Sequence, residues 1–107
     1  MAKLNQLIRD LNLTVEEYYA RLFASDDTDF VKMFEKKNIT AYIFKSNTID
    51  NIEDAYPSIT DKSRNLFNQL KETFFYFLVL HQGEKYDIPN EVFDTVEEAV
   101  EYLKKNL

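Results

Sequence analysis

His81 is the only histidine in the chain, so any reaction that needs an imidazole must use this side chain. A serine, histidine and aspartate relay would be centred on it, and metal sites built on two or more histidines are excluded. His81 follows an apolar stretch, a position where histidines commonly lie half-buried at the end of a strand. We therefore expect a structural role for His81, and the alternative is an enzyme in which it acts as a lone base.

Three pairs of adjacent carboxylates are the formal candidates for general acid–base catalysis, namely Glu16/Glu17, Asp26/Asp27 and Glu97/Glu98. Adjacent residues on a helix point in different directions, and acids near a helix N-terminus are favoured by the helix dipole. The aspartate cluster at positions 26, 27 and 29 lacks the glycine and the final glutamate of an EF-hand calcium loop. The chain has no cysteine, which excludes thiolate catalysis and cysteine-ligated zinc. We therefore expect no catalytic site, no metal site and no bound cofactor.

The acidic side chains instead form two groups in a chain of net charge −6. The first group, which we expect to bind a partner together with the exposed ring of Tyr56, comprises Asp26, Asp27, Asp29, Asp50, Glu53 and Asp54. The second group leads into the last predicted helix and continues along it, and it comprises Glu91, Asp94, Glu97, Glu98 and Glu101. Positions 94, 98 and 101 are spaced to share one side of a helix. A surface that only confers solubility normally mixes both signs of charge, so the clustering favours recognition of a basic partner over the solubility alternative.

The elements that must position these groups begin with helices. Apolar residues recur with helical spacing at residues 4–12, 14–24, 25–37, 60–70 and 95–107. Thr14 and Glu17 form a capping box at the start of the second segment. In the third segment Phe30, Met33 and Phe34 form a narrower stripe. The sequence thus predicts four to five helices.

Strands are predicted between these helices. At residues 39–44 the apolar period changes to two, which predicts the first strand. Residues 46–57 have the composition of a loop, with one helical turn at 49–55. Residues 73–81 are almost continuously apolar, as in a central strand covered on both faces, and residues 85–88 pair with them in a hairpin that turns at Gly83. We predict an α+β fold, with a small antiparallel sheet of about three strands, a C-terminal hairpin and the helices packed on it.

The composition limits the remaining possibilities. The 107 residues include nine Phe and seven Tyr, enough for one ordered domain over residues 1–107. One glycine and two prolines leave no phosphate-binding loop and no linker. No stretch approaches the roughly 20 apolar residues of a membrane span, and the first residues lack the apolar run of a signal peptide. We expect a cytoplasmic protein, and its negative charge disfavours direct contact with nucleic acid or membranes.

The tyrosines admit two interpretations. Those at positions 18, 19, 42, 76 and 86 are either anchors of a binding surface or core residues with a polar tip at its edge. We expect most of them in the core.

The overall profile resembles small phage-borne inhibitors of the anti-CRISPR kind: small size, acidity, no cysteine, a composition rich in Asn, Lys, Ile, Phe and Tyr, and no catalytic set. The resemblance implies a non-enzymatic inhibitor in a bacterial host cell, which acts as a DNA mimic and occludes a basic nucleic-acid-binding surface of an RNA-guided defence nuclease. It carries over no site residue. The alternatives are an immunity protein that neutralises a nuclease toxin, and a small self-associating regulatory protein, so the chain is expected to be a monomer or a homodimer.

Overall fold

The computed structural model describes residues 2–25, 28–47, 59–71 and 73–107, and for residues 21–25 it describes the backbone alone. The helices are α1 (Lys3–Asp10), α2 (Val15–Ser25), α4 (Asp61–Leu70) and α5 (Val96–Asn106), and the strands are β1 (Thr28–Lys36), β2 (Ile39–Asn47), β3 (Phe74–Gln82) and β4 (Lys85–Asp87). The strands form one antiparallel sheet in the order β1-β2-β3-β4. The α+β class is confirmed, and the sheet has four strands where the sequence predicts about three.

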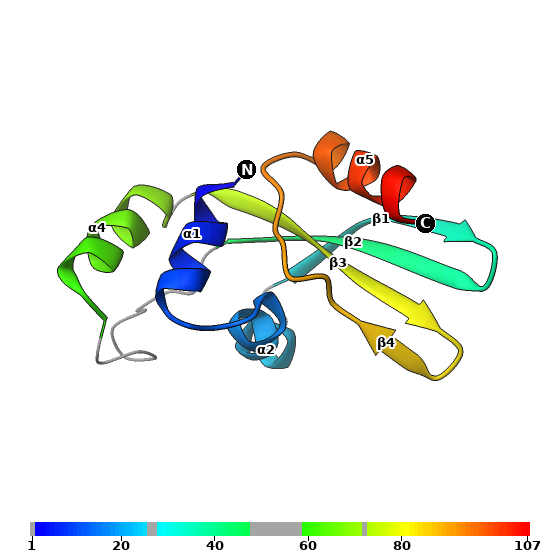
Figure 1. The fold of residues 1–107 in the computed structure, drawn as a ribbon, viewed down its shortest axis with the longest axis horizontal. Helices are drawn as coiled ribbons and strands as arrows, with labels where there is room; N and C mark the ends of the chain where they lie inside the picture. The colour runs from blue at the N-terminus through cyan, green and yellow to red at the C-terminus, as the bar shows by residue number, and fades with distance from the viewer. Residues whose placement is uncertain (1, 26–27, 48–58, 72) are drawn as a thin grey trace.

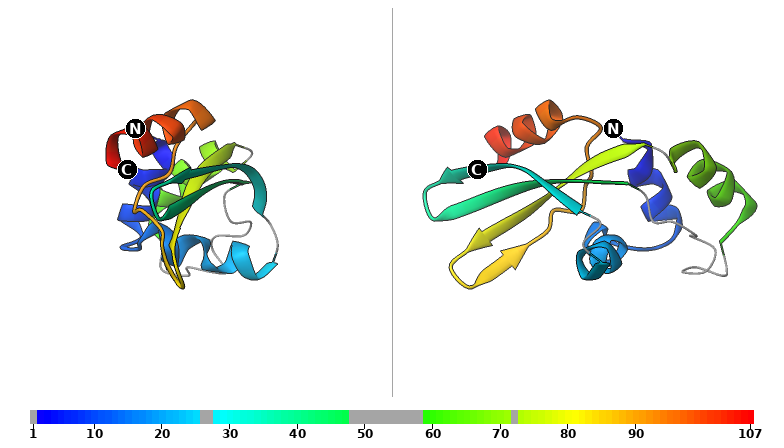
Figure 2. Two further views of the ribbon diagram at one scale, coloured as in Figure 1. Left: turned by 90° about the vertical axis from the view of Figure 1, so that its right-hand side faces the viewer. Right: turned by 180° about the vertical axis from the view of Figure 1, so that it is seen from behind.

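The sheet is a middle layer with helices on both of its faces (Figure 1, Figure 2). Helices α1 and α2 pack on one face, which we call the α2 face, with α4 beside α1. Helix α5 packs on the opposite face, which we call the α5 face. Alternate residues of β2 and β3 enter the two cores: Tyr42, Phe44, Phe75, Phe77 and Val79 on the α2 face, and Ala41, Ile43 and Leu78 on the α5 face. This confirms the prediction that the apolar run at 73–81 is a strand covered on both sides.

The predicted helix at residues 25–37 is wrong, because most of this segment is strand β1, paired with β2. A β-bulge between Phe30 and Lys32 explains the misleading pattern. The bulge inserts one residue, so Phe30 and Met33 both point to the α2 face although they are three positions apart. In a regular strand their odd spacing would place them on opposite faces, and it therefore resembles a helical stripe. The two-residue turn to β2 places Lys37 at a φ of 57°.

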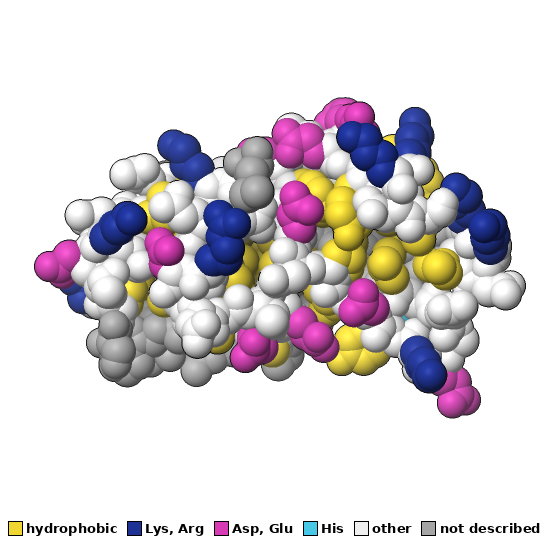
Figure 3. Space-filling view, viewed as in Figure 1, with side chains coloured by type: hydrophobic (Ala, Val, Ile, Leu, Met, Phe, Trp, Pro, Cys, Tyr) yellow, Lys and Arg dark blue, Asp and Glu magenta, His cyan; other side chains and the backbone are white. Residues whose placement is uncertain are grey.

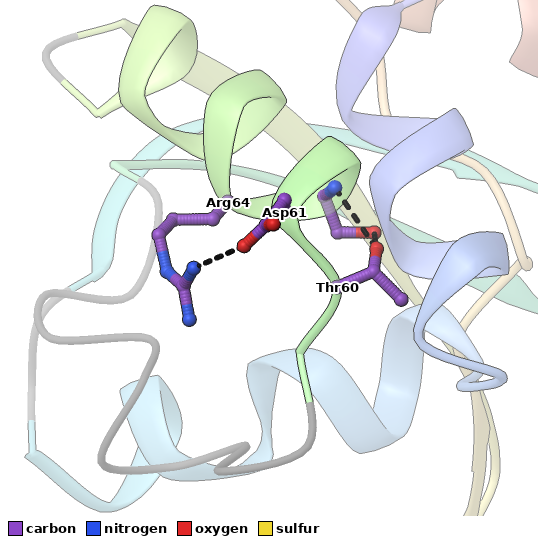
Figure 4. Close-up of polar contacts among 4 residues, drawn as sticks. Thr60, Asp61 and Arg64 are labelled. Carbon is purple, nitrogen blue, oxygen red and sulfur yellow. Dashed lines mark hydrogen bonds and ion pairs between the residues drawn. The ribbon is translucent and has the colours of Figure 1, made fainter.

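Helices α2, α4 and α5 each begin directly after a threonine that caps them. The capping box of α2 forms, since the Glu17 amide donates to Thr14 Oγ1 and the Thr14 amide to Glu17 Oε1, each at 3.1 Å. Thr60 caps α4 by accepting from the Ser63 amide at 3.2 Å, and Arg64 pairs with Asp61 one turn along at 2.7 Å (Figure 4). Thr95 caps α5 in the same way. The predictions for residues 60–70 and 95–107 are thereby confirmed.

Gly83 adopts a φ of 64° in the turn of the β3–β4 hairpin, as the sequence predicts.

The chain between β4 and α5 connects the two cores. Beyond β4, Phe93 forms a β-bridge to Tyr76 through two backbone hydrogen bonds of 2.8 and 2.9 Å. Val92 points the other way, into the core beneath α1, where its amide and carbonyl bond to the buried side chain of Asn5. The sequence carries no local signal for this long-range pair.

The Tyr19 side chain is fully buried and stacks on Phe77 with ring centroids 4.4 Å apart, yet its hydroxyl has no hydrogen-bond partner within the described part of the chain. An unpaired buried hydroxyl costs about 1–3 kcal/mol. Tyr19→Phe is therefore expected to raise the free energy of unfolding by about 1 kcal/mol, measured by urea denaturation. Tyr18 is equally buried, but its hydroxyl is not one of the buried polar atoms that lack a hydrogen-bond partner. Tyr18→Phe should therefore give no gain. A gain from Tyr18→Phe and none from Tyr19→Phe would contradict this assignment.

The same residue gives a pH dependence. Burial, followed by the neighbouring Tyr18, raises the pKa of Tyr19 well above its ordinary value. Because the folded-state pKa exceeds the unfolded one, the stability linked to the protonated hydroxyl is complete below about pH 10 and is lost above it. Tyr19→Phe should remove this part of the alkaline loss.

Candidate functional site

The part of the α2 face beyond helices α1 and α2 presents aromatic side chains from all four strands. The strand register places these rings and the side chains beside them in three cross-strand rows. Each row is written from β1 toward β4: Phe30, Phe44, Phe77; Met33, Tyr42, Val79; and Glu35, Thr40, His81, Tyr86. Phe77 is fully buried beneath Tyr19, whereas Phe30 and Tyr86, at opposite edges of the sheet, are 58% and 59% exposed. The α2 face therefore passes from buried rings beneath α2 to an open surface at both edges of the sheet.

A groove of about 530 Å³ lies on this face, between α2, the strands and the start of the segment after β4. We call it the aromatic groove, and its lining residues are Glu16, Ala20, Tyr42, Phe44, Val79, His81, Tyr86 and Ile88. Glu16 and Ala20 are four residues apart, so α2 presents both along one side. A volume of this size lies within the range of sites that hold a small molecule or a few side chains.

Several of the rings at the aromatic groove contact one another. Tyr42 meets the His81 ring edge-on, with centroids 5.3 Å apart and an interplanar angle of 89°. His81 also lies 6.0 Å from the Tyr86 ring, and Phe30 contacts Tyr42 and Phe44 at 6.2 and 6.1 Å. Edge-to-face contacts at these distances are favourable and restrict rotation. Tyr42, His81 and Tyr86 therefore form one continuous aromatic wall of the groove.

Charge is divided between the two faces of the sheet. Each lysine of the described strands is placed by the register on the α5 face: Lys32, Lys36, Lys45 and Lys85. Lys36 donates from Nζ to the carbonyl oxygen of Leu107 at the end of α5, and Lys45 lies over the Phe74 ring. The α2 face carries Glu35 on β1 and Glu16 on α2, at opposite sides of the aromatic surface. The aromatic groove thus has one acid in its lining and a second in the same cross-strand row as His81, on the face opposite the strand lysines.

Of the first predicted acidic group, Asp29 alone lies among the described residues. It is exposed on β1, opposite Lys45 in the register and on the α5 face. The remaining members and the predicted aromatic anchor lie outside the described residues, as does the predicted helical turn at 49–55: Asp26, Asp27, Asp50, Glu53, Asp54 and Tyr56.

The second predicted acidic group lies at the start of α5 and in the segment before it. Asp94, Glu98 and Glu101 are exposed, and Glu101 pairs with Lys105 at 3.8 Å. Glu91 is half-buried and is joined by a residue that the sequence did not single out, Asp87 of β4. Burial raises the pKa of Tyr102 on α5, and the carboxylates of Glu91 and Asp87 raise it further. Acids from β4, the connecting segment and α5 therefore lie on one side of the molecule.

Charge along α5 changes sign from its start to its end. Acidic side chains gather over the start of α5 and the segment leading into it, and basic ones over its end (Figure 3). This order follows the helix dipole, since Glu97 and Glu98 occupy the first turn and Lys104 and Lys105 the last. We call the negative half the α5 acidic surface, defined by Asp87, Glu91, Asp94, Glu97 and Glu98.

The structure places His81 at the end of β3 as predicted, but its side chain is exposed and lines the aromatic groove. Tyr42 and Tyr86 also line it, whereas Tyr18 and Tyr19 are core residues. The groove as a unit was missed. One signal for it is present in residues 39–44, where one strand face is aromatic and the other aliphatic, but nothing in the sequence shows that α2 stops short of covering the aromatic face.

Within residues 2–25, 28–47, 59–71 and 73–107, no three carboxylate or histidine side chains are grouped closely enough to hold a metal ion. Among the helices described, none has the length and apolar character needed to cross a membrane.

Comparison of the chain with protein-family models, with curated proteins and with solved structures found no match.

Proposed function

We propose that this protein is a non-enzymatic binding protein whose α5 acidic surface recognises a basic surface of another protein. The observation that supports the proposal is that acids gather over the start of α5 and the segment leading into it (Figure 3), and that Glu91 and Asp87 lie close enough to Tyr102 of the same helix to raise its pKa. Most of them are exposed and two lie in the first turn of a capped helix, so they are held on a rigid support. A negative patch of this kind accelerates association with a positive one and makes it sensitive to salt.

In its specific form, the proposal is an inhibitor that competes with nucleic acid for a basic groove. Carboxylates held on a rigid helix offer the same sign of charge as the phosphates that such a groove normally binds. An RNA-guided defence nuclease in the cytoplasm of a bacterial host is the partner suggested by the resemblance in overall profile.

The test uses charge reversal on α5. The immobilised protein is exposed to native host lysate, and the amount of retained nucleic-acid enzyme is measured at roughly 50 and 500 mM salt. Wild type should retain the enzyme at the lower concentration and release it at the higher one. The double variant Asp94→Lys/Glu98→Lys should retain at least about tenfold less enzyme, because two lysines then face the basic surface of the partner.

The matched control is Asp10→Lys/Glu84→Lys, which changes the net charge equally at exposed positions away from α5. It should retain the enzyme nearly as well as wild type. If both double variants lose retention equally, net charge and not the α5 acidic surface determines binding. If neither loses it, the proposed function is wrong.

A further inference from the structure

The aromatic groove is an apolar surface on the side of the sheet opposite α5. Its lining is almost entirely aromatic and aliphatic, and the apolar surface continues past it along β1, where Phe30 and Met33 are 58% and 47% exposed. Aromatic side chains have only two side-chain torsions and therefore lose little conformational freedom when a partner covers them. Apolar patches of this kind, rimmed by polar groups, mark interaction sites.

The charges at its rim determine what fits. Glu16 lines the aromatic groove from α2, and Glu35 lies in the same cross-strand row as His81 and Tyr86. The strand lysines lie on the other face. Aromatic ring faces attract cations, and a nearby carboxylate adds to that attraction. A purely apolar ligand would leave both features unused.

We infer that the aromatic groove binds an amphipathic segment of another protein that carries lysine or arginine beside its apolar residues. The apolar residues would fill the groove against Tyr42, Phe44 and Val79, and the aliphatic stem of the basic residue would cross the exposed rings toward Glu16. This adds a second contact surface to the binding function proposed above, and it does not require the α5 acidic surface.

Two other occupants fit the structure less well. A second copy of the chain, related by two-fold symmetry, would bring the groove's acids against the same acidic patch of its mate. Addition of a strand at the β1 edge is opposed by the bulge between Phe30 and Lys32 and by the edge lysines Lys32 and Lys36. A partner that approaches the open face with opposite charge avoids both obstacles.

The test measures binding of a fluorescently labelled helical peptide of roughly 18 residues, built from Leu and Lys with helical spacing. The decisive variant is Glu16→Lys/Tyr86→Ser, which alters one acid and one exposed ring of the groove. Its matched control is Asp61→Lys/Phe74→Ser, since Asp61 is also an exposed acid in the first turn of a helix and Phe74 is an exposed ring, 45% exposed on the α5 face. Circular dichroism establishes that both variants are folded.

The groove variant should weaken peptide binding by at least about tenfold, and the control by less than about threefold. A peptide with Gln in place of Lys should bind wild type at least about tenfold more weakly. Equal losses in the two variants, or equal binding of the Lys and Gln peptides, would overturn the inference. Failure of the α5 variant Asp94→Lys/Glu98→Lys to lose its host partner, with peptide binding intact, would count against the proposed function alone.

Amide chemical shifts of the wild-type protein give a second measurement that needs no substitution. Titration with the Lys peptide should perturb the amides of Tyr42, His81 and Tyr86 more strongly than those of α5. Perturbations confined to α5 would overturn the inference even if the groove variant failed to fold.

Discussion

Phe77→Ala is expected to lower the free energy of unfolding by about 3–5 kcal/mol, a large part of the roughly 5–15 kcal/mol that stabilises a domain of this size. Phe77 is fully buried in the middle of β3, where Tyr19 stacks on it at 4.4 Å and Phe44 at 5.6 Å. Its removal leaves a cavity between α2 and the sheet that the surrounding strands cannot close. Urea denaturation followed by circular dichroism measures the loss, and the melting temperature should fall by on the order of 15–25 °C.

Phe74→Ala is the control for this prediction, because it makes the same change on the same strand. Phe74 is 45% exposed at the start of β3 and contacts Lys45 from the α5 face. Its loss should cost no more than about 1 kcal/mol. If the two variants were destabilised equally, the stacked rings would not be the centre of the α2-face core.

Asn5→Leu is expected to cost roughly 2–4 kcal/mol, although it keeps the size of the side chain and increases its apolar character. The Asn5 amide donates to the Val92 carbonyl at 3.0 Å and accepts from the Val92 amide at 2.8 Å, so it replaces a missing strand partner. Leucine leaves both backbone groups buried without a bond. The loss is measured by urea denaturation, and Asn68→Leu on the exposed side of α4 should stay within about 0.5 kcal/mol of wild type.

Asn5→Asp separates the two hydrogen bonds. The carboxylate still accepts from the Val92 amide, but when ionised it faces the Val92 carbonyl oxygen without a proton to donate. Burial and this repulsion should raise the folded-state pKa of the new carboxyl. Its stabilising contribution is then complete below about pH 4 and is lost as pH rises through the raised value. A variant whose stability, relative to wild type, is unchanged between about pH 4 and 7 would contradict this account.

The candidate sites depend on the fold to different degrees. The acids that lead into α5 and follow its first turns were found from the sequence, because helical spacing and capping are local properties. Asp87 was not, since its proximity to Tyr102 depends on how β4 is placed beside α5. The aromatic groove needed both the pairing of four strands and the length of sheet that α2 leaves uncovered.

The sequence by itself determined the capped helices α2, α4 and α5, strand β3 and the hairpin at Gly83, because each has a strong pattern within a few neighbouring residues. Only the tertiary structure decided that residues 28–36 form a strand. There the bulge makes Phe30 and Met33 share a face and so imitates a helical stripe, while pairing with β2 supplies the backbone hydrogen bonds. Pairing between distant segments has no local signature, and for that reason the open aromatic face and the Asn5–Val92 contact were determined by the fold.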